Sequence, residues 1–173
     1  MKFSLLLASM LIGTTFNAFA DEAKSLTVHE EVTINAPAAK VWAKISNFND
    51  LGAWHPAVKT TEIIKGKNNK VGAQRLLTLQ DGGTIKEKLL GYNAKAKTFK
   101  YSIVESVLPV TSYVSSVTVK SLGKDQSVVV WKGTFKRKDT SATPAEGQDD
   151  ATAEKVITSV YRGGLDNLKE ISE

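Results

Sequence analysis

The segment that decides the fold is the last long one, residues 149–171, which reads DDATAEKVITSVYRGGLDNLKEI. Its apolar residues recur at steps of three and four, which is the spacing of one face of an α-helix. These residues are Ala153, Val156, Ile157, Val160, Tyr161, Gly164, Leu165, Leu168 and Ile171. Asp149 or Asp150 can cap this helix, because an Asp side chain accepts hydrogen bonds from free backbone N–H groups. So wide an apolar stripe has to cover another surface, and we expect that surface to be a sheet.

The sheet is predicted from the region between Ala57 and Lys138, where six runs rich in Val, Ile, Thr and aromatic residues are separated by turn signals. The turns are expected at residues 65–70, 81–83, 93–97, 108–109 and 123–126. An earlier strand is predicted at residues 26–35, because Val28, Val32 and Ile34 alternate with polar residues. Seven strands therefore precede the long helix.

Two short helices are predicted between the first strand and the other six. Pro37 suits the first position of a helix, where its missing N–H costs nothing. Val41 and Trp42 follow at helical spacing, and a second short turn at residues 49–54 ends before Pro56, which cannot donate to a continuing helix. This order predicts an α+β fold in which a curved, seven-stranded antiparallel sheet wraps around the long C-terminal helix.

The N-terminus differs from the rest of the chain. Lys2 is followed by an apolar run from Phe3 to Gly13 and by the small-residue end Ala18-Phe19-Ala20. This pattern predicts a signal peptide at residues 1–20, cleaved after Ala20, because the run is far shorter than the roughly 20 residues of a membrane-spanning helix. We therefore expect a periplasmic or secreted protein without a membrane span, with one domain at residues 21–173.

Composition narrows the function further. The chain has 173 residues and no Cys, which excludes disulfides, thiolate metal sites and Cys nucleophiles. His29 and His55 are its two His residues, too few for a histidine zinc site. The 23 Lys and Arg residues are scattered along the chain, so no nucleic-acid partner is expected. No phosphate loop, nucleophile elbow or metal motif is present, and the sequence predicts no cofactor.

One segment of the domain has the composition of a loop. Residues 139–149 are small, polar and acidic, with Pro144 and Gly147. We expect a flexible surface loop there, because the segment has little apolar surface to bury.

The order of elements and several short sequence segments resemble those of the SRPBCC superfamily. This superfamily includes the polyketide cyclase/dehydrase, START and Bet v 1-like proteins and has the helix-grip fold. The segments that carry the resemblance are Ile34-Asn35-Ala36-Pro37, Val41-Trp42, Trp54-His55-Pro56, Val71-Gly72, Asp81-Gly82-Gly83 and Tyr161-Arg162-Gly163-Gly164-Leu165. With the export signal, the chain is similar to the periplasmic MxaD-like subgroup, named for an accessory protein of methanol oxidation.

The resemblance implies a deep ligand-binding cavity between the sheet and the long helix. Strand alternation places Val71, Arg75 and Leu77 on one inward face, and Ile85 and Glu87 on the next. The residues predicted to bind a ligand are Trp54, His55, Lys59, Arg75, Glu87, Tyr101, Tyr113, Ser115, Trp131, Phe135, Tyr161, Gly164 and Leu165. Such a lining is mostly apolar with a few polar groups, which is how small-molecule sites are built.

Several of these residues have two interpretations from sequence. Arg75 and Glu87 are either a structural ion pair between adjacent strands or polar anchors for a ligand. Lys59 stands where hormone-binding members of the fold have a ligand anchor, but a surface Lys fits as well. His55 is a weak candidate for a catalytic acid or base, since no carboxylate nearby in sequence orients it. The Gly163-Gly164 pair either permits close packing against a bulky residue such as Trp131 or makes room for a ligand.

Three functions stay open at this stage. The first is binding of a hydrophobic or amphipathic small molecule. The second, which the MxaD resemblance implies, is an accessory protein that contacts a periplasmic dehydrogenase or its cytochrome. The third is a polyketide cyclase/dehydrase-like enzyme that uses polar groups of the pocket as acid and base.

Overall fold

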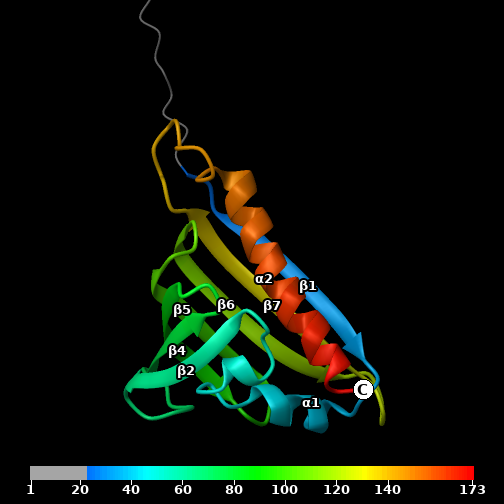
Figure 1. Cartoon of the computed structure of the whole chain (residues 1–173). Coiled ribbons are helices and arrows are strands. Elements are labelled where there is room, and N and C mark those ends of the chain that lie inside the picture. The colour runs from blue at the N-terminus through cyan, green and yellow to red at the C-terminus, as the bar shows by residue number, and fades with distance from the viewer. Residues whose placement is uncertain (1–22) are drawn as a thin grey trace, which may run out of the picture.

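A computed structural model describes residues 23–173, so the predicted signal peptide at residues 1–20 lies outside the described part of the chain. Seven antiparallel strands form one sheet in the order β1-β7-β6-β5-β4-β3-β2. The strands are β1 (Leu26–Ile34), β2 (Val58–Lys65), β3 (Gln74–Leu79), β4 (Thr84–Asn93), β5 (Thr98–Ser106), β6 (Val110–Ser121) and β7 (Ser127–Arg137). The long helix α2 (Asp150–Glu170) lies across the concave side of this sheet (Figure 1). The α+β helix-grip prediction is thereby confirmed.

The connection from β1 to β2 contains the helix α1 (Ala38–Ile45) and a single 3₁₀ turn, η1 (Leu51–Ala53). Thus only one of the two predicted short helices is an α-helix. Pro37 stands at the N-cap, one position before the predicted place, with an extended ψ of 140°. Ala38, Val41, Trp42 and Ile45 form the buried face of α1, and they close one end of the interior.

The sheet curves because its ladders are interrupted. The register shifts between β2 and β3, between β4 and β5, and between Thr111 and Val114 in the pairing of β6 with β7. A bulge adds a residue to one strand, which bends that strand and increases its twist. In β6 the shift contains Ser112, whose φ of 52° is rare for a residue with a side chain. These bends let the sheet curl around α2.

Helix α2 begins as the sequence predicts. Asp149 is the N-cap, and its side chain accepts a hydrogen bond from the Thr152 N–H at 2.7 Å. The buried face of the helix consists of Ala153, Ile157, Tyr161, Gly164, Leu165 and Leu168. Arg162 ties the helix to β1 by donating to Glu30 Oε2 at 3.1 Å and to the Glu31 carbonyl at 3.0 Å. The helix therefore packs along β1 and β7, and its buried face covers the interior of the curved sheet.

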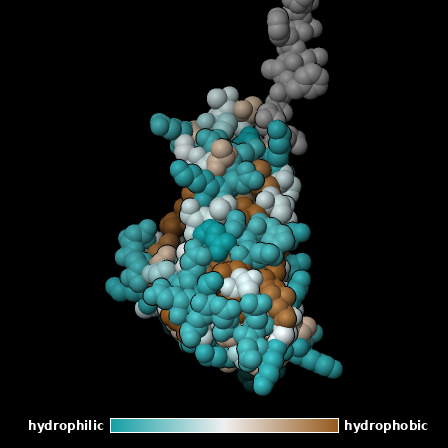
Figure 2. All heavy atoms as spheres, turned by 90° about the vertical axis from the view of Figure 1, so that its right-hand side faces the viewer, coloured by the Kyte–Doolittle hydropathy of each residue, from teal (hydrophilic) through white to brown (hydrophobic). Residues whose placement is uncertain are grey.

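The outer surface on the side of α2 and β1 is mostly hydrophilic, with hydrophobic atoms visible in separate patches (Figure 2). Within residues 23–173 no helix combines the length and the apolar character that crossing a membrane requires.

Two surface segments differ in part from the sequence-based predictions. The inward position predicted for Val71 is wrong: β3 begins only at Gln74, and Val71 is 68% exposed in the turn before it.

The predicted loop at residues 139–149 is irregular, and it has ordered contacts at its base. Buried Arg137 donates to the carbonyls of Asp139 and Ser141, both at 2.8 Å. The mobility of this loop stays a prediction.

Candidate ligand-binding site

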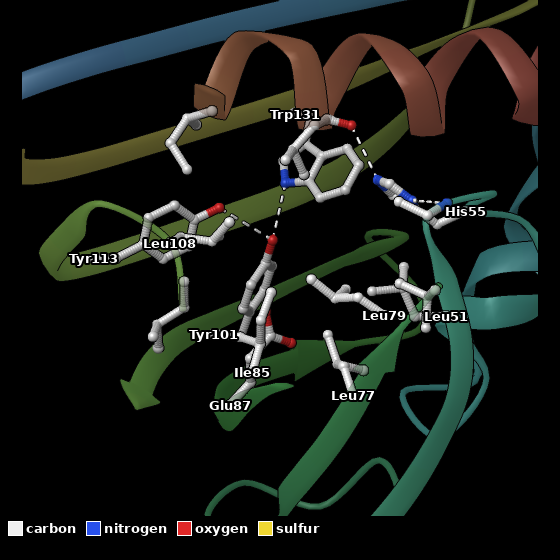
Figure 3. Close-up of a pocket in the computed structure, with 15 residues that line it drawn as sticks. Leu51, His55, Leu77, Leu79, Ile85, Glu87, Tyr101, Leu108, Tyr113 and Trp131 are labelled. Carbon is white, nitrogen blue, oxygen red and sulfur yellow. Dashed lines mark hydrogen bonds between the residues drawn. The ribbon is translucent and has the colours of Figure 1, made fainter. Parts of the chain in front are cut away.

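A cavity lies between α2 and the inward faces of the sheet, with a volume of about 70 Å³ (Figure 3). Its lining residues come from η1, β2–β7, α2 and the loops at one end of the sheet: Leu51, His55, Ala57, Val58, Leu77, Leu79, Ile85, Glu87, Tyr101, Ile103, Leu108, Tyr113, Trp131, Ile157 and Val160. The cavity is mostly apolar, and it is well below the ~300 Å³ at which ordinary ligand pockets begin. The deep cavity that the resemblance implies is therefore largely filled.

The predicted site residues fall into three groups. The cavity is lined by His55, Glu87, Tyr101, Tyr113 and Trp131. The buried residues behind this lining are Trp54, Arg75, Ser115, Phe135, Tyr161, Gly164 and Leu165. Lys59 is exposed on β2 and does not line the cavity, so its role as a ligand anchor stays a prediction. Leu51, Leu108, Ile157 and Val160 line the cavity without having been singled out, because an apolar side chain carries no signal that separates a cavity wall from a core.

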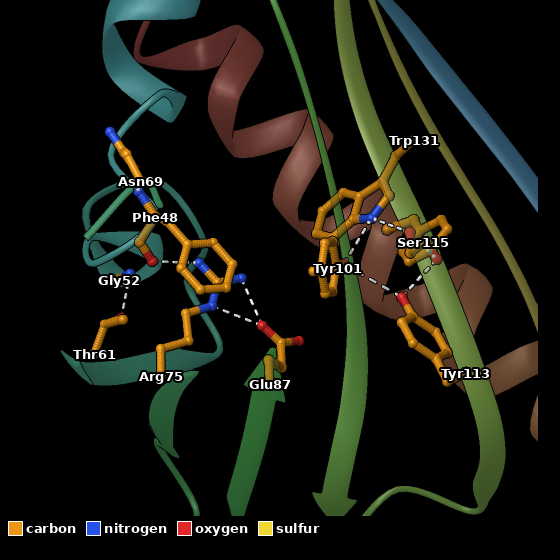
Figure 4. Close-up of polar contacts among 11 residues, drawn as sticks. Phe48, Gly52, Thr61, Asn69, Arg75, Glu87, Tyr101, Tyr113, Ser115 and Trp131 are labelled. Atoms are coloured by element: carbon orange, nitrogen blue, oxygen red, sulfur yellow. Dashed lines mark hydrogen bonds and ion pairs between the residues drawn. The ribbon is translucent and has the colours of Figure 1, made fainter. Parts of the chain in front are cut away.

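Part of the interior is occupied by a tyrosine network, which we define as Tyr101, Tyr113, Ser115, Trp131 and Tyr161. Figure 4 shows the first four of these residues. Trp131 Nε1 donates to Tyr101 Oη at 3.0 Å and to Ser115 Oγ at 3.1 Å. The indole of Trp131 also stacks on the Tyr161 ring, with centroids 4.4 Å apart and planes inclined by 11°. The network joins three strands to α2 in the middle of the interior.

The direction of every hydroxyl proton in this network follows from one carbonyl. Ser115 Oγ donates to the Lys132 carbonyl at 2.9 Å, and a carbonyl oxygen can only accept. The 2.8 Å contact between Ser115 and Tyr161 must then be donated by Tyr161, and the 2.6 Å contact between Tyr113 and Tyr161 by Tyr113. The longer 3.3 Å contact is donated by Tyr101 to Tyr113. Each hydroxyl hydrogen is thereby used once.

The strand register builds this network. Ser115 of β6 is paired with Tyr101 of β5 on one side and with Gly133 of β7 on the other. A Cβ at Gly133 would overlap with the Tyr161 hydroxyl, so the glycine makes room for that hydroxyl to approach the sheet. Burial raises the pKa of Tyr161 to about 12, and it raises the pKa values of Tyr101 and Tyr113 well above their usual 10. All three phenols are therefore neutral at physiological pH.

The second polar cluster is the pair of Arg75 and Glu87, which face each other across the β3–β4 hairpin. Arg75 Nε and Nη2 both contact Glu87 Oε2 at 2.6 Å, and Nη1 donates to the Phe48 carbonyl at 2.7 Å. The guanidinium carbon lies 4.0 Å from the centroid of the Phe48 ring, which is a cation–π geometry. The structural ion pair of the two sequence interpretations is thus present, and Phe48 is a partner that sequence reasoning missed.

Glu87 keeps one oxygen free of the pair. The residue is 4% exposed and lines the cavity, whereas Arg75 lies behind it. Within residues 23–173, Glu87 Oε1 accepts no hydrogen bond, because both Arg75 contacts go to Oε2. Burial raises the pKa of Glu87, and the adjacent Arg75 charge acts in the opposite direction by favouring the carboxylate. The pair can therefore also serve as a polar anchor, as the second interpretation requires.

His55 is held against α2 by backbone groups. Its Nδ1 accepts from the Ala57 N–H at 3.2 Å, so Nδ1 carries no proton, and Nε2–H donates to the Val160 carbonyl at 3.0 Å. Burial lowers the pKa of His55 below its usual 6.5, which keeps the ring neutral. Since both ring nitrogens have backbone partners, this arrangement supports a packing role for His55.

Gly164 allows His55 to lie so close to the helix. A Cβ at this position would be 2.7 Å from His55 Cδ2 and 2.9 Å from Trp131 Cζ3, so the close-packing interpretation of Gly164 is confirmed. At Gly163, by contrast, an added Cβ would meet only open space. Asn167 Nδ2 adds a hydrogen bond to the Trp54 carbonyl at 2.9 Å, which holds the Trp54-His55 turn on α2.

A groove of about 540 Å³ lies on the surface beside the cavity. Its lining residues are His55, Pro56, Ala57, Thr152, Lys155, Val156, Ser159, Val160 and Gly163. His55, Ala57 and Val160 line both spaces, so the groove adjoins the cavity at these three residues. No cluster of three or more His, Asp or Glu side chains suited to a metal ion occurs in the described part of the chain.

Comparison with known proteins places this geometry among known folds. Residues 25–173 match the family described as polyketide cyclase / dehydrase and lipid transport. The structure of the protein XoxI from Bacillus cereus superposes with a TM-score of 0.74 at 29% identity, covering 84% of this chain and 94% of that one. The Zhui aromatase/cyclase from Streptomyces sp. R1128 shares the fold with a TM-score of 0.68 at 15% identity, covering 86% and 94%. In sequence, the MLP-like protein 423 of Arabidopsis thaliana is 26% identical over 117 residues, which span 64% of this chain and 76% of that protein.

Proposed function

The chain belongs to the polyketide cyclase/dehydrase and lipid transport family, and from this premise we propose that it binds a small hydrophobic or amphipathic molecule in the cavity between the sheet and α2. The observation that carries the proposal is the cavity itself. Its walls are apolar, and they include one buried carboxylate that the surrounding side chains do not fully satisfy. Apolar walls with a few placed polar groups are the usual construction of a small-molecule site.

The volume of the cavity limits the ligand. About 70 Å³ holds a few water-sized groups, so a larger molecule needs the walls to move. The surface groove is the place that we propose for this movement, because it adjoins the cavity at His55, Ala57 and Val160. The binding mode that we propose is therefore entry from the groove at residues 152–163, followed by burial against Leu77 and Ile85.

Toluene is a suitable probe, because its affinity depends on apolar walls alone. We expect it to cause saturable chemical-shift changes in the protein at one site. Leu108→Trp, which places a larger side chain at the cavity rim, should weaken toluene binding at least tenfold. Val104→Trp is the matched control, since Val104 follows Ile103 on β5 and is 54% exposed. Equal toluene binding by both variants, or no binding by the native protein, would contradict the proposal.

Export belongs to this proposal, and it is supported by the short apolar run and the Ala18-Phe19-Ala20 end of residues 1–20. The mature protein should begin at Asp21 in the periplasm or the medium. N-terminal sequencing of protein recovered from the source cells tests this, and an intact Met1 would refute it. A role as an MxaD-like accessory protein stays a prediction of the resemblance.

A further inference from the structure

The cavity offers a ligand one kind of polar partner. Among the side chains that line it, those with N–H or O–H groups are His55, Tyr101, Tyr113 and Trp131. His55 Nε2–H donates to the Val160 carbonyl, and Trp131 Nε1–H donates within the tyrosine network. The hydroxyl hydrogens of Tyr101 and Tyr113 are directed to the next members of that network. None of these side-chain donors is left for a ligand.

The guanidinium of Arg75 is not available to the ligand either. It lies behind the lining, where Nε and Nη2 contact Glu87 Oε2 and Nη1 donates to the Phe48 carbonyl. The side-chain group that remains is Glu87 Oε1, a carboxylate acceptor on a residue that is 4% exposed. Because Glu87 lines the cavity and no described side chain donates to Oε1, a ligand that enters the cavity can donate a hydrogen bond to this oxygen, and hydrogen bonds to charged groups are the stronger ones.

We propose that the ligand of this cavity is a neutral molecule with a hydroxyl or N–H donor, and that it donates this hydrogen to Glu87 Oε1. Neutrality follows from charge: Arg75 and Glu87 compensate each other, so a charged ligand would bring an unpaired charge into an apolar space. Carboxylates are disfavoured twice, because they are anionic and because they have no hydrogen to donate. This proposal rests on the proposed function and defines the ligand class of the same cavity.

The test uses four probes of similar size on the mature protein: phenol, benzonitrile, toluene and benzoate. Phenol donates a hydrogen bond, benzonitrile only accepts one, toluene does neither, and benzoate is an anion. Since a hydrogen bond to a charged group contributes about 1.5–3 kcal/mol, calorimetry should show phenol binding about tenfold or more tighter than benzonitrile. Benzoate should bind more weakly than toluene. Benzonitrile or benzoate binding as tightly as phenol would overturn the proposal.

Glu87→Gln sharpens the test, because an amide can both donate and accept. The preference for phenol over benzonitrile should shrink severalfold in this variant and persist in Glu105→Gln, the same change at a carboxylate on the exposed end of β5. If Glu87→Gln does not fold, the four probes on the native protein decide. Toluene binding that Leu108→Trp abolishes, without any preference for phenol, would overturn this inference and leave the proposed function intact. Failure of all four probes to bind would overturn both.

Discussion

The interior holds two polar clusters in the same apolar surroundings, and they differ in what they leave unpaired. In the tyrosine network, each hydroxyl hydrogen is donated to the next oxygen until the Lys132 carbonyl ends the series. In the pair of Arg75 and Glu87, both contacts converge on one carboxylate oxygen, and the other oxygen faces the cavity. The network therefore has a structural role, whereas the unpaired oxygen of the ion pair is the basis of the ligand contact that we propose.

The largest effect is expected from breaking the ion pair on one side. Arg75→Met leaves the Glu87 carboxylate buried without its partner, which should lower the free energy of unfolding by about 3–5 kcal/mol. Urea denaturation measures this loss. The double variant Arg75→Met/Glu87→Leu should recover most of it, because apolar residues of similar volume can replace a buried pair at little cost. A double variant as unstable as the single one would show that packing, not charge, sets the effect.

Disrupting the tyrosine network should lower the free energy of unfolding by less than Arg75→Met does. Tyr161→Phe removes the acceptor of Tyr113 and a donor to Ser115, so we expect a loss of about 1–3 kcal/mol in the free energy of unfolding. Tyr92→Phe is the matched control: its hydroxyl donates to the Ser46 carbonyl at 2.9 Å in a half-buried place. The control should lose less. If Tyr161→Phe is as stable as the native protein, the closed network contributes no support to the fold.

The packing around the network can be tested with two adjacent glycines of α2. Gly164→Ala should destabilise by about 1–3 kcal/mol, because its Cβ would press on His55 and Trp131. Gly163→Ala has open space and should gain up to about 1 kcal/mol from helix propensity. Thermal unfolding should therefore move in opposite directions for the two variants. The same sign for both would contradict the close contact of α2 with the network.

The smallest effect is expected from pH. Burial lowers the pKa of His55, so the unfolded chain takes up a proton at this residue before the folded protein does. The contribution of His55 to stability is therefore complete above pH 6.5 and is lost as the pH falls through its folded-state pKa. The burial that raises the pKa of Glu87 acts with the opposite sign above pH 4.5, so His55 must be isolated by difference.

Unfolding free energies of the native protein and of His55→Gln, measured between pH 5 and pH 8, provide this difference. The stability advantage of the native protein should decrease toward pH 5. His29→Gln is the control for the substitution itself, since His29 is exposed on β1. An advantage that stays constant with pH would mean that His55 is not held neutral by burial.

The sequence was sufficient to predict the fold, because strand alternation, turn residues and the stripe of α2 are local signals. It also placed Arg75 and Glu87 on inward faces of adjacent strands, and the register confirms their contact. The Phe48 carbonyl that binds Arg75 could not be predicted, because it lies 27 residues away and depends on how the connection from α1 folds back. Val71 was assigned inward by alternation, which says nothing of where a strand begins.

The size of the cavity was beyond sequence reasoning for a different reason. The inward aromatic residues could line an empty space or fill it, and the side-chain conformations decide. Tyr161 reaches the sheet through the space at Gly133, and its contacts with Tyr113 and Ser115 draw these side chains into the interior. Neither the spacing of the glycines nor the residue types predict that side chains from two strands and a helix meet in the interior. The small volume of the cavity is the result of that meeting.

The claim that the cavity is the binding site is tested most directly by intermolecular nuclear Overhauser effects from bound phenol to assigned methyl groups. We expect contacts to Leu77 and Ile85, which line the cavity and not the surface groove. Val156 lines the groove and not the cavity, so its methyl groups should show none. Contacts to Val156 without contacts to Leu77 and Ile85 would place the ligand on the surface and contradict the account.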